Sequence, residues 1–107
     1  MTTFDKREEG FEKQFAHDEE LRFKAAARRN RMLGIWAAGK LGLSGTQADA
    51  YAKDVIMAAL DNAGEDGVFA KIRHDFDEKG VAQSDHQIRR TMDELMARAV
   101  AEVKTSG

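Results

Sequence analysis

The sequence contains no proline among its 107 residues, and this absence constrains the fold more than any other feature. Proline breaks or kinks a helix because it lacks the backbone N–H and its ring clashes with the preceding turn. Nothing in this chain therefore forces a long helix to end. Five methionines and few β-branched residues also favour helices over strands. We expect an all-α protein and, at this length, a single bundle with its own core.

The composition excludes several classes of function. The chain has no cysteine, which excludes disulfide scaffolds, thiolate zinc sites and thiol catalysis. No apolar run approaches the roughly 18 residues that a membrane span needs, and the N-terminus is charged from Asp5 onward, unlike a signal peptide. Charged residues make up 34% of the chain. We therefore expect a soluble, cytoplasmic protein that does not insert into a membrane.

Capping signals divide the chain into helices. Two serines each precede a glutamine by three residues, a spacing that lets the hydroxyl and the amide satisfy free backbone N–H groups at a helix start. Asp66 is predicted to be the N-cap of a further helix, and three glycines stand where a helix end favours the left-handed conformation. The two boxes are Ser44 with Gln47 and Ser84 with Gln87, and the glycines are Gly42, Gly64 and Gly80. These signals predict helices over residues 20–41, 45–63, 67–79 and 85–104, as in a small four-helix bundle.

Apolar residues recur at helical spacing within these segments. Residues 32–38 are apolar all round, which predicts burial on several sides. The second helix has a broad face of mostly small residues, which lets a neighbouring helix come close; its members are Ala48, Ala52, Val55, Ile56, Ala59 and Leu60. The stripe of the third helix is Phe69, Ile72 and Phe76, and that of the last is Ile88, Met92, Leu95, Ala99 and Val103.

Residues 1–19 differ from the rest of the chain. They carry six acidic and three basic side chains, Gly10 interrupts them, and their aromatic residues form one thin stripe of Phe4, Phe11 and Phe15. Three phenylalanines cannot offset an ordering entropy of about 1–2 kcal/mol per residue. We therefore divide the chain into a mobile segment at 1–19, which becomes helical on a partner, and a four-helix bundle at 20–107.

Three motifs resemble binding or metal sites without meeting their requirements. Gly34–Leu41 fits the spacing of a phosphate-binding loop, but Leu41 replaces the Ser or Thr that binds magnesium, and no strand precedes it. Asp75–Gly80 resembles the start of a calcium loop, but later ligand positions carry a lysine and a histidine. His74 and Glu78 share a helix face without a third ligand. Since no catalytic arrangement can be identified either, we predict no metal site and no enzymatic activity.

A basic block lies near the start of the first predicted helix and contains Arg22, Lys24, Arg28, Arg29 and Arg31. Such a block can bind phosphates, nucleic acid or an acidic protein surface. Alternatively, the arginine stems cover the bundle while their heads pair with acidic residues at 61–66 or 75–78. The net charge of −2 argues against nucleic acid as a partner. Both of the other interpretations stay open, and if the block binds the phosphates of a nucleotide, the candidate residues are Lys24, Arg28, Arg29 and Arg31.

Four stretches resemble a known family. They are MTTFDKREEGFEKQFAHDEELRFKAAARRNRMLGIWAAGKLGLSG, AYAKDV, GEDGVFAKIRHDFDEKGV and SDHQIRRTMDEL. Together they make the chain similar to the alphaproteobacterial zeta-subunit family, inhibitors of the F-type ATP synthase. The resemblance implies a four-helix bundle with a mobile N-terminal segment that enters the catalytic head at an α/β subunit interface and blocks ATP hydrolysis. It also implies weak binding of ATP or ADP, without catalysis and without a resident cofactor.

The same resemblance places the inhibitory segment at residues 1–19. The positions expected to contact the partner are Thr2, Thr3, Phe4, Asp5, Lys6, Arg7, Phe11, Phe15, Ala16 and His17. The protein would then be cytoplasmic and held at the membrane-bound synthase through its head. Two other functions stay open at this point: a small helical domain that senses ATP or ADP through the basic block, and a minor protein associated with nucleic acid.

Overall fold

The computed structural model describes the backbone of residues 2–61 and 64–106 and the side chains of residues 19–61 and 64–105. Its helices are α1 (Thr2–Lys40), α2 (Gly45–Asp61), α3 (Glu65–Lys79) and α4 (Asp85–Ser106). Within these described ranges there is no strand. The all-α, four-helix fold is thus confirmed, and the bounds of α2, α3 and α4 differ from the predicted ones by at most two residues.

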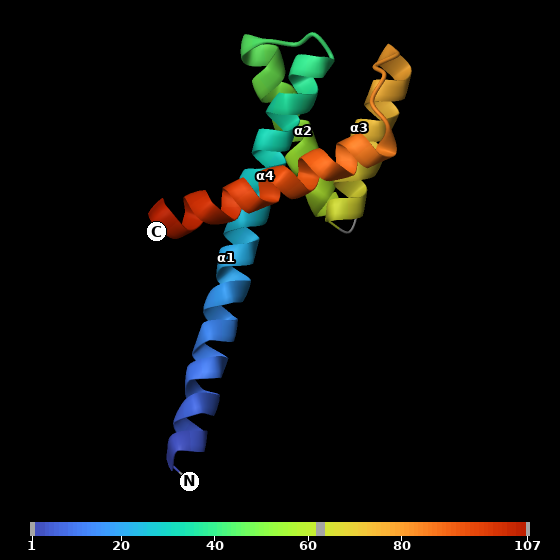
Figure 1. Cartoon of the computed structure of the whole chain (residues 1–107). Helices are drawn as coiled ribbons and strands as arrows, with labels where there is room; N and C mark the ends of the chain where they lie inside the picture. The colour runs from blue at the N-terminus through green and yellow to red at the C-terminus, as the bar shows by residue number, and fades with distance from the viewer. Residues whose placement is uncertain (1, 62–63, 107) are drawn as a thin grey trace.

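Helix α1 is longer than predicted. It begins at Thr2, not at residue 20, and runs for 39 residues. A single internal glycine costs a helix only about 1 kcal/mol, so Gly10 is not sufficient to end it, and no proline does so. The N-terminal part of α1 projects well beyond the other three helices (Figure 1). The predicted mobility of residues 1–19 concerns motion and stays a prediction, but the proposed boundary falls inside one continuous helix.

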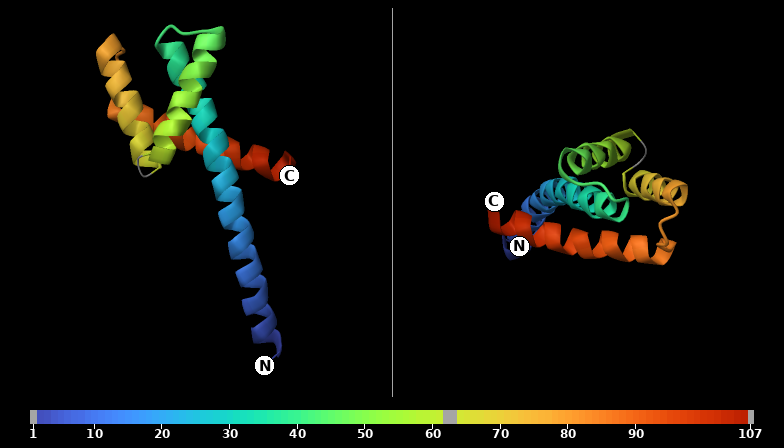
Figure 2. Two further views of the ribbon diagram at one scale, coloured as in Figure 1. Left: turned by 180° about the vertical axis from the view of Figure 1, so that it is seen from behind. Right: turned by 90° about the horizontal axis from the view of Figure 1, so that it is seen from above.

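The C-terminal half of α1 is the central element of the bundle. It packs against α2 and against α4, while α3 packs against α2 and, to a smaller extent, against α4. Helix α4 crosses α1 instead of running parallel to it, as the views from the front and from above both show (Figures 1 and 2). No helix in the described part of the chain is long and apolar enough to cross a membrane.

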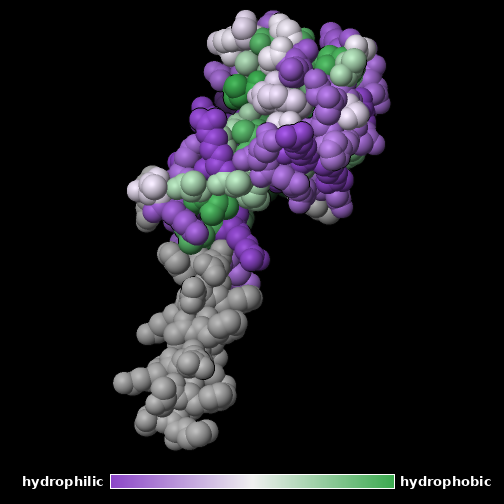
Figure 3. All heavy atoms as spheres, in the orientation of Figure 1, coloured by the Kyte–Doolittle hydropathy of each residue, from purple (hydrophilic) through white to green (hydrophobic). Residues whose placement is uncertain are grey.

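All four helices contribute to the main core. Its buried residues are Leu33, Ala37 and Ala38 of α1, Tyr51 and Val55 of α2, Val68, Ile72 and Phe76 of α3, and Ile88 and Met92 of α4. The predicted stripes of α3 and α4 are therefore confirmed. Trp36 packs on this core with its ring centroid 5.7 Å from that of Phe76. Figure 3 shows hydrophilic residues over most of the α3 and α4 surface in view.

Two predicted core positions are exposed. Leu60 in the last turn of α2 is 72% exposed and Ile35 of α1 is 40% exposed. Both prove wrong for the same geometric reason. Only the faces of α1 and α2 that other helices cover are buried. Apolar residues that continue around the helix, past the covered face, remain exposed to solvent.

A close crossing joins α1 to α2 at Gly34. A Cβ atom placed on Gly34 would lie 2.6 Å from the Cα atom of Ala52, nearer than any real side-chain carbon approaches a backbone atom. The small-residue face predicted for the second helix does let its neighbour come close, and Ala52 is the position where this happens.

The capping predictions have mixed outcomes. At the start of α4, the Ser84 N–H donates to Gln87 Oε1 (2.8 Å) and the Gln87 N–H donates to Ser84 Oγ (3.1 Å), which confirms the second box. The first box is wrong, since the Gln47 N–H donates to the Ser44 carbonyl oxygen (3.2 Å) and not to its hydroxyl. Gly45, which follows Ser44, has a φ of 56°, so the first residue of α2 departs from the regular helical conformation that follows an N-cap.

The glycine predictions are confirmed and the aspartate prediction is not. Gly42, Gly64 and Gly80 all have positive φ angles, and the Val81 N–H donates to the Phe76 carbonyl oxygen (2.8 Å) around Gly80, as expected where a helix ends in a left-handed residue. Asp66 is not the N-cap, because α3 already begins at Glu65 with Gly64 before it. Asp66 lies in the first helical turn instead, where its negative charge interacts favourably with the helix dipole.

Candidate functional site

The candidate inhibitory segment lies on the projecting part of α1. The residues expected to contact the partner, from Thr2 to His17, belong to this helix by their backbone. Their side chains lie outside the described residues, so their individual roles stay predictions. What the structure describes is how the rest of α1 is held where the segment meets the bundle.

A small apolar cluster, which we call the α1–α4 cluster, holds α1 directly after this segment. Its buried members are Ala25 of α1 with Ala99 and Val103 of α4, and its partly buried members are Leu21, Met32, Met96 and Val100. Figure 3 shows hydrophobic residues gathered where the C-terminal end of α4 crosses α1. The small side chains of Ala25 and Ala99 allow the two helices to approach closely. Helix α4 therefore determines the direction in which the N-terminal part of α1 leaves the bundle.

Ion pairs on the surface support the same crossing. Arg28 of α1 lies with its guanidinium 3.4 Å from Glu102 of α4, and Arg98 of α4 donates to the same carboxylate at 3.1 Å. Lys24 pairs with Glu20 one turn earlier on α1 at 3.4 Å. Exposed pairs of this kind contribute about 0–1 kcal/mol each, so the apolar contacts account for most of the attachment.

Arg29 has a different environment from its neighbours in the basic block. Its side chain is only 4% exposed, and its Nε donates to Asn30 Oδ1 at 2.8 Å. A guanidinium nitrogen lies 3.7 Å from a carboxylate oxygen of Glu65 at the start of α3. Burial lowers the pKa of Arg29, while the charges of Glu65 and Asp93 oppose this shift. For Arg29 the alternative of pairing with the acidic region at 61–66 is therefore confirmed.

Arg31 lies at a shallow hollow between α1 and α2. The hollow has a volume of about 310 Å³ and is lined by Arg31, Asp49, Ala52, Lys53 and Ile56. The four candidate nucleotide-binding residues thus point to different surroundings. Lys24 and Arg28 reach acidic partners, Arg29 is buried, and Arg31 alone lines a hollow with a second cation. The structure does not bring the four together.

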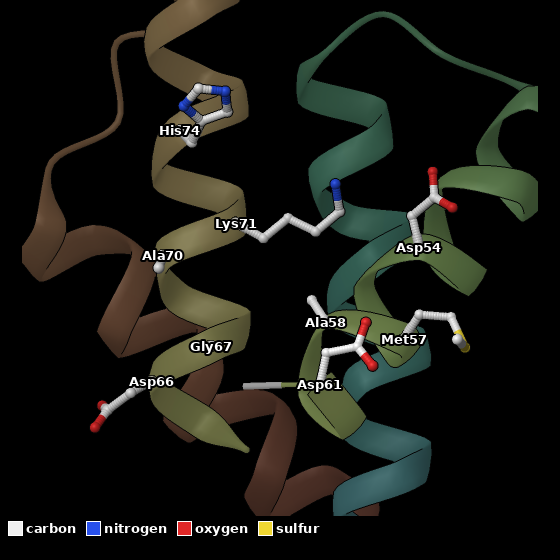
Figure 4. A pocket seen from close by; sticks show the side chains of 9 residues that line it. All are labelled: Asp54, Met57, Ala58, Asp61, Asp66, Gly67, Ala70, Lys71 and His74. Carbon is white, nitrogen blue, oxygen red and sulfur yellow. The ribbon is translucent and has the colours of Figure 1, made fainter. Parts of the chain in front are cut away.

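A larger cleft separates α2 from α3, and the sequence motifs did not indicate it. It has a volume of about 860 Å³ and is lined by Asp54, Met57, Ala58, Asp61, Asp66, Gly67, Ala70, Lys71 and His74. Figure 4 shows Lys71 extending from α3 toward α2, with Asp54 and Asp61 on the α2 side. A signal was present in the sequence, since Asp54, Met57, Ala58 and Asp61 follow the spacing of one helix face. The opposing wall comes from another helix, and this pairing cannot be read from α2 alone.

A hydrogen-bonded network forms one end of this cleft. The Tyr51 hydroxyl donates to Asp75 Oδ2 at 2.7 Å, and Lys71 Nζ donates to the same oxygen at 3.0 Å. Lys71 Nζ also lies 5.1 Å from the centroid of the Tyr51 ring. Burial, reinforced by the hydrogen bond to Asp75, raises the pKa of Tyr51 well above its usual range. The network links α2 to α3 through a phenol that stays protonated.

The segments that resemble a phosphate-binding loop and a calcium loop have structural roles here. Gly34–Leu41 lies almost entirely within α1, and Asp75–Gly80 covers the end of α3 and its glycine, so neither segment is a ligand-binding loop. The expectation that His74 and Glu78 have no third ligand nearby is wrong, because one ligand atom each from His74, Asp75 and Glu78 lies within 4.8 Å of the others. The Asp75 carboxylate already accepts hydrogen bonds from Tyr51 and Lys71.

Comparisons with known proteins agree with this architecture. A family model described as "ATPase inhibitor subunit zeta" matches residues 1–102. A solved solution NMR structure is 38% identical to the chain, covers 81% of this chain and 99% of that one, and superposes with a TM-score of 0.69. No curated protein matches the chain.

Proposed function

This chain belongs to the family of ATPase inhibitor subunit zeta, and from that premise we propose that it inhibits ATP hydrolysis by the F-type ATP synthase by inserting the N-terminal part of α1 at a catalytic α/β interface of the head. The observation that carries the proposal is the family match over residues 1–102, which includes both the segment and the bundle. An inhibitor of this kind is a binding protein and needs no catalytic residues. Its place in the cell is at the head of the membrane-bound synthase.

The projecting helix supports the insertion mechanism. The N-terminal part of α1 extends beyond the other helices (Figure 2), so a partner can surround it without unfolding the bundle. Phe4, Phe11 and Phe15 recur at helical spacing and would occupy apolar pockets of the partner. Lys6, Arg7 and the carboxylates of the segment would pair along the rim of the interface.

Inhibition follows from differential binding. The catalytic interfaces of a rotary ATPase must open and close in turn, and a helix bound to one state makes the departure from that state more costly. Coupled ordering of the segment reduces the net affinity, and a preformed continuation of the same helix in the bundle lowers that cost because helix nucleation is the unfavourable step.

A crosslinking experiment tests both the activity and the location. The full chain is added to isolated synthase heads, and the rate of ATP hydrolysis is measured against its concentration. Because the chain has no cysteine, Thr3→Cys carries a single photoreactive probe in the segment, and Ala97→Cys on the exposed side of α4 serves as a matched control. We expect full inhibition, with crosslinks from position 3 to the α and β subunits and few from position 97. Hydrolysis that continues at saturating inhibitor contradicts the proposal.

We further propose that the chain binds adenine nucleotide weakly at the hollow beside Arg31. Arg31 and Lys53 supply two cations for phosphate oxygens, which outnumber the single carboxylate of the hollow, that of Asp49, while Ile56 and Ala52 supply apolar lining. The expected result is that Arg31→Ala abolishes the NMR chemical-shift changes that ATP causes in α1 and α2. Arg22→Ala removes an exposed charge from the same block and should leave those changes intact. Equal responses from both variants would contradict this location.

A further inference from the structure

One face of α2 carries a pattern that the proposed function does not use. Asp54, Met57, Ala58 and Asp61 follow one another at the three- and four-residue steps of a helix face and form one wall of the α2–α3 cleft. Met57 is 53% exposed although it is a large apolar residue. Figure 4 shows the two carboxylates along α2, with Met57 and Ala58 between them along the helix.

The charges in the cleft are unequally compensated. Asp66 accepts a hydrogen bond from Arg89 at 3.2 Å, and Lys71 is neutralised by Asp75 at 3.0 Å. His74 lies 3.5 Å from Glu78 and is charged only when protonated. No ion pair involving Asp54 or Asp61 occurs among the described residues. Lys71 extends toward α2 (Figure 4), but its ammonium group is paired with Asp75. The α2 wall therefore has two carboxylates without an ion-pair partner, on either side of an apolar centre.

We infer that the α2–α3 cleft docks a cationic amphipathic helix of the synthase head, as a second contact separate from the inserted segment. The inference rests on the proposed function, because it assigns a second binding surface to the same partner. Asp54 and Asp61 are seven residues apart, or about 10.5 Å along the helix. A partner helix with two lysines or arginines seven residues apart and apolar residues between them matches this spacing, and an apolar groove is a common receptor for such a helix.

The charges in the cleft favour a cationic helix over two other occupants, a nucleotide and a second copy of this chain. Phosphate groups of a nucleotide would face the uncompensated carboxylates and be repelled by them. A second copy of this chain could present Lys24 and Arg31, which are also seven residues apart. However, Lys24 already pairs with Glu20, and Arg31 shares its hollow with Asp49.

Charge reversal in the full-length chain tests the inference. Asp54→Lys with Asp61→Lys removes the two carboxylates of the α2 wall. Asp85→Lys with Glu94→Lys changes the net charge by the same amount at exposed positions that line neither the cleft nor the hollow beside Arg31. Binding of each protein to isolated synthase heads is measured by titration calorimetry at two salt concentrations, alongside inhibition of ATP hydrolysis. Melting curves followed by circular dichroism check that both variants remain folded.

We expect the cleft variant to bind at least tenfold more weakly than the wild type, and the control variant to bind within about twofold of it. The difference should shrink at high salt because exposed charges are then screened. Met57→Ser should also weaken binding several-fold, whereas Ile35→Ser, at another exposed apolar position, should not.

Several results would overturn the inference. Equal weakening by the two charge-reversal variants would indicate a general charge effect, and no weakening by either would remove the cleft from the interface. With either result, the proposed function would still hold if the wild-type chain inhibits ATP hydrolysis. A wild-type chain that does not inhibit would contradict the proposed function and this inference together. Sedimentation that shows a dimer of the wild type but not of the cleft variant would assign the cleft to a second copy.

Discussion

A single absent side chain determines how closely α1 and α2 pack. Because a Cβ atom on Gly34 would meet the backbone of Ala52 at 2.6 Å, Gly34→Ala forces the helices apart, and we expect a loss of about 1–3 kcal/mol in the free energy of unfolding. Gly39→Ala is the matched control. It lies in the same helix with nothing within 4 Å of the added atom, so it should stabilise the protein by about 0.5–1 kcal/mol. Urea denaturation of the two variants measures the contrast, and two stabilised variants would contradict the close crossing.

Neighbouring arginines of α1 should respond very differently to truncation. Arg29→Ala leaves the buried Asn30 without its hydrogen-bond donor and Glu65 without a nearby cation. We expect a cost of about 1–3 kcal/mol from the unsatisfied buried group. Arg28→Ala breaks only an exposed pair with Glu102 and should cost less than about 1 kcal/mol. Thermal melting followed by circular dichroism compares them, and equal effects would contradict the buried position of Arg29.

The phenol of Tyr51 should not ionise while the protein is folded. Its pKa is raised by burial and by the hydrogen bond to Asp75, whereas the unfolded chain releases this proton near pH 10. The contribution of Tyr51 to stability is therefore full below about pH 10 and decreases as the pH rises above that value. Tyr51 is the only tyrosine, so the increase in absorbance near 295 nm that accompanies tyrosine ionisation comes from this residue. The absorbance should rise together with unfolding, and a rise in the folded protein near pH 10 would contradict the contact.

At the level of helices, α1 combines two parts that should be separable. The N-terminal part of α1 projects beyond the other three helices (Figure 1), and its three phenylalanines form only one thin stripe. Removing residues 1–19 should therefore leave the melting temperature nearly unchanged while it abolishes inhibition of the synthase head. Within the segment, Phe11→Ala and Phe15→Ala should weaken inhibition most, by about 2 kcal/mol of binding free energy or more each, and Lys6→Ala should weaken it less. Inhibition by the truncated protein at the original concentration would contradict the assignment, as would loss of the fold.

Helix limits could be predicted where the signal is local. The Ser84–Gln87 box and the glycine at position 80 depend on four or five consecutive residues, and both predictions are confirmed. The same serine–glutamine spacing failed at Ser44 because the next residue, Gly45, adopts a left-handed conformation. The start of α1 lies earlier than predicted because no residue in 2–19 is a strong enough helix breaker to end the helix. The predicted mobility of this stretch stays a prediction.

At the scale of the whole molecule, the four-helix fold could be predicted but the surfaces between helices could not. The stripes of α3 and α4 identified which residues are buried, yet nothing in them specified that α4 would cross α1 at Ala25 and Ala99. The basic block illustrates the same limit. Its members are adjacent in sequence, but one is buried against α3 and another lines a hollow against α2. The α2–α3 cleft was missed because its two walls come from separate segments.

The unbroken helical backbone of α1 has a consequence for the mechanics of inhibition once its N-terminal part is ordered on the partner. Ala25, in the α1–α4 cluster, is 23 residues from Thr2, or about 35 Å along a straight helix. A tilt of about 10° at that pivot would sweep the tip sideways by about 6 Å, a full turn's worth of helix pitch. A repacking of Ala99 against Ala25 would thus be magnified into a larger displacement of the tip. The direction in which the inhibitory segment approaches the synthase then depends on the packing of the α1–α4 cluster as much as on the residues of the segment itself.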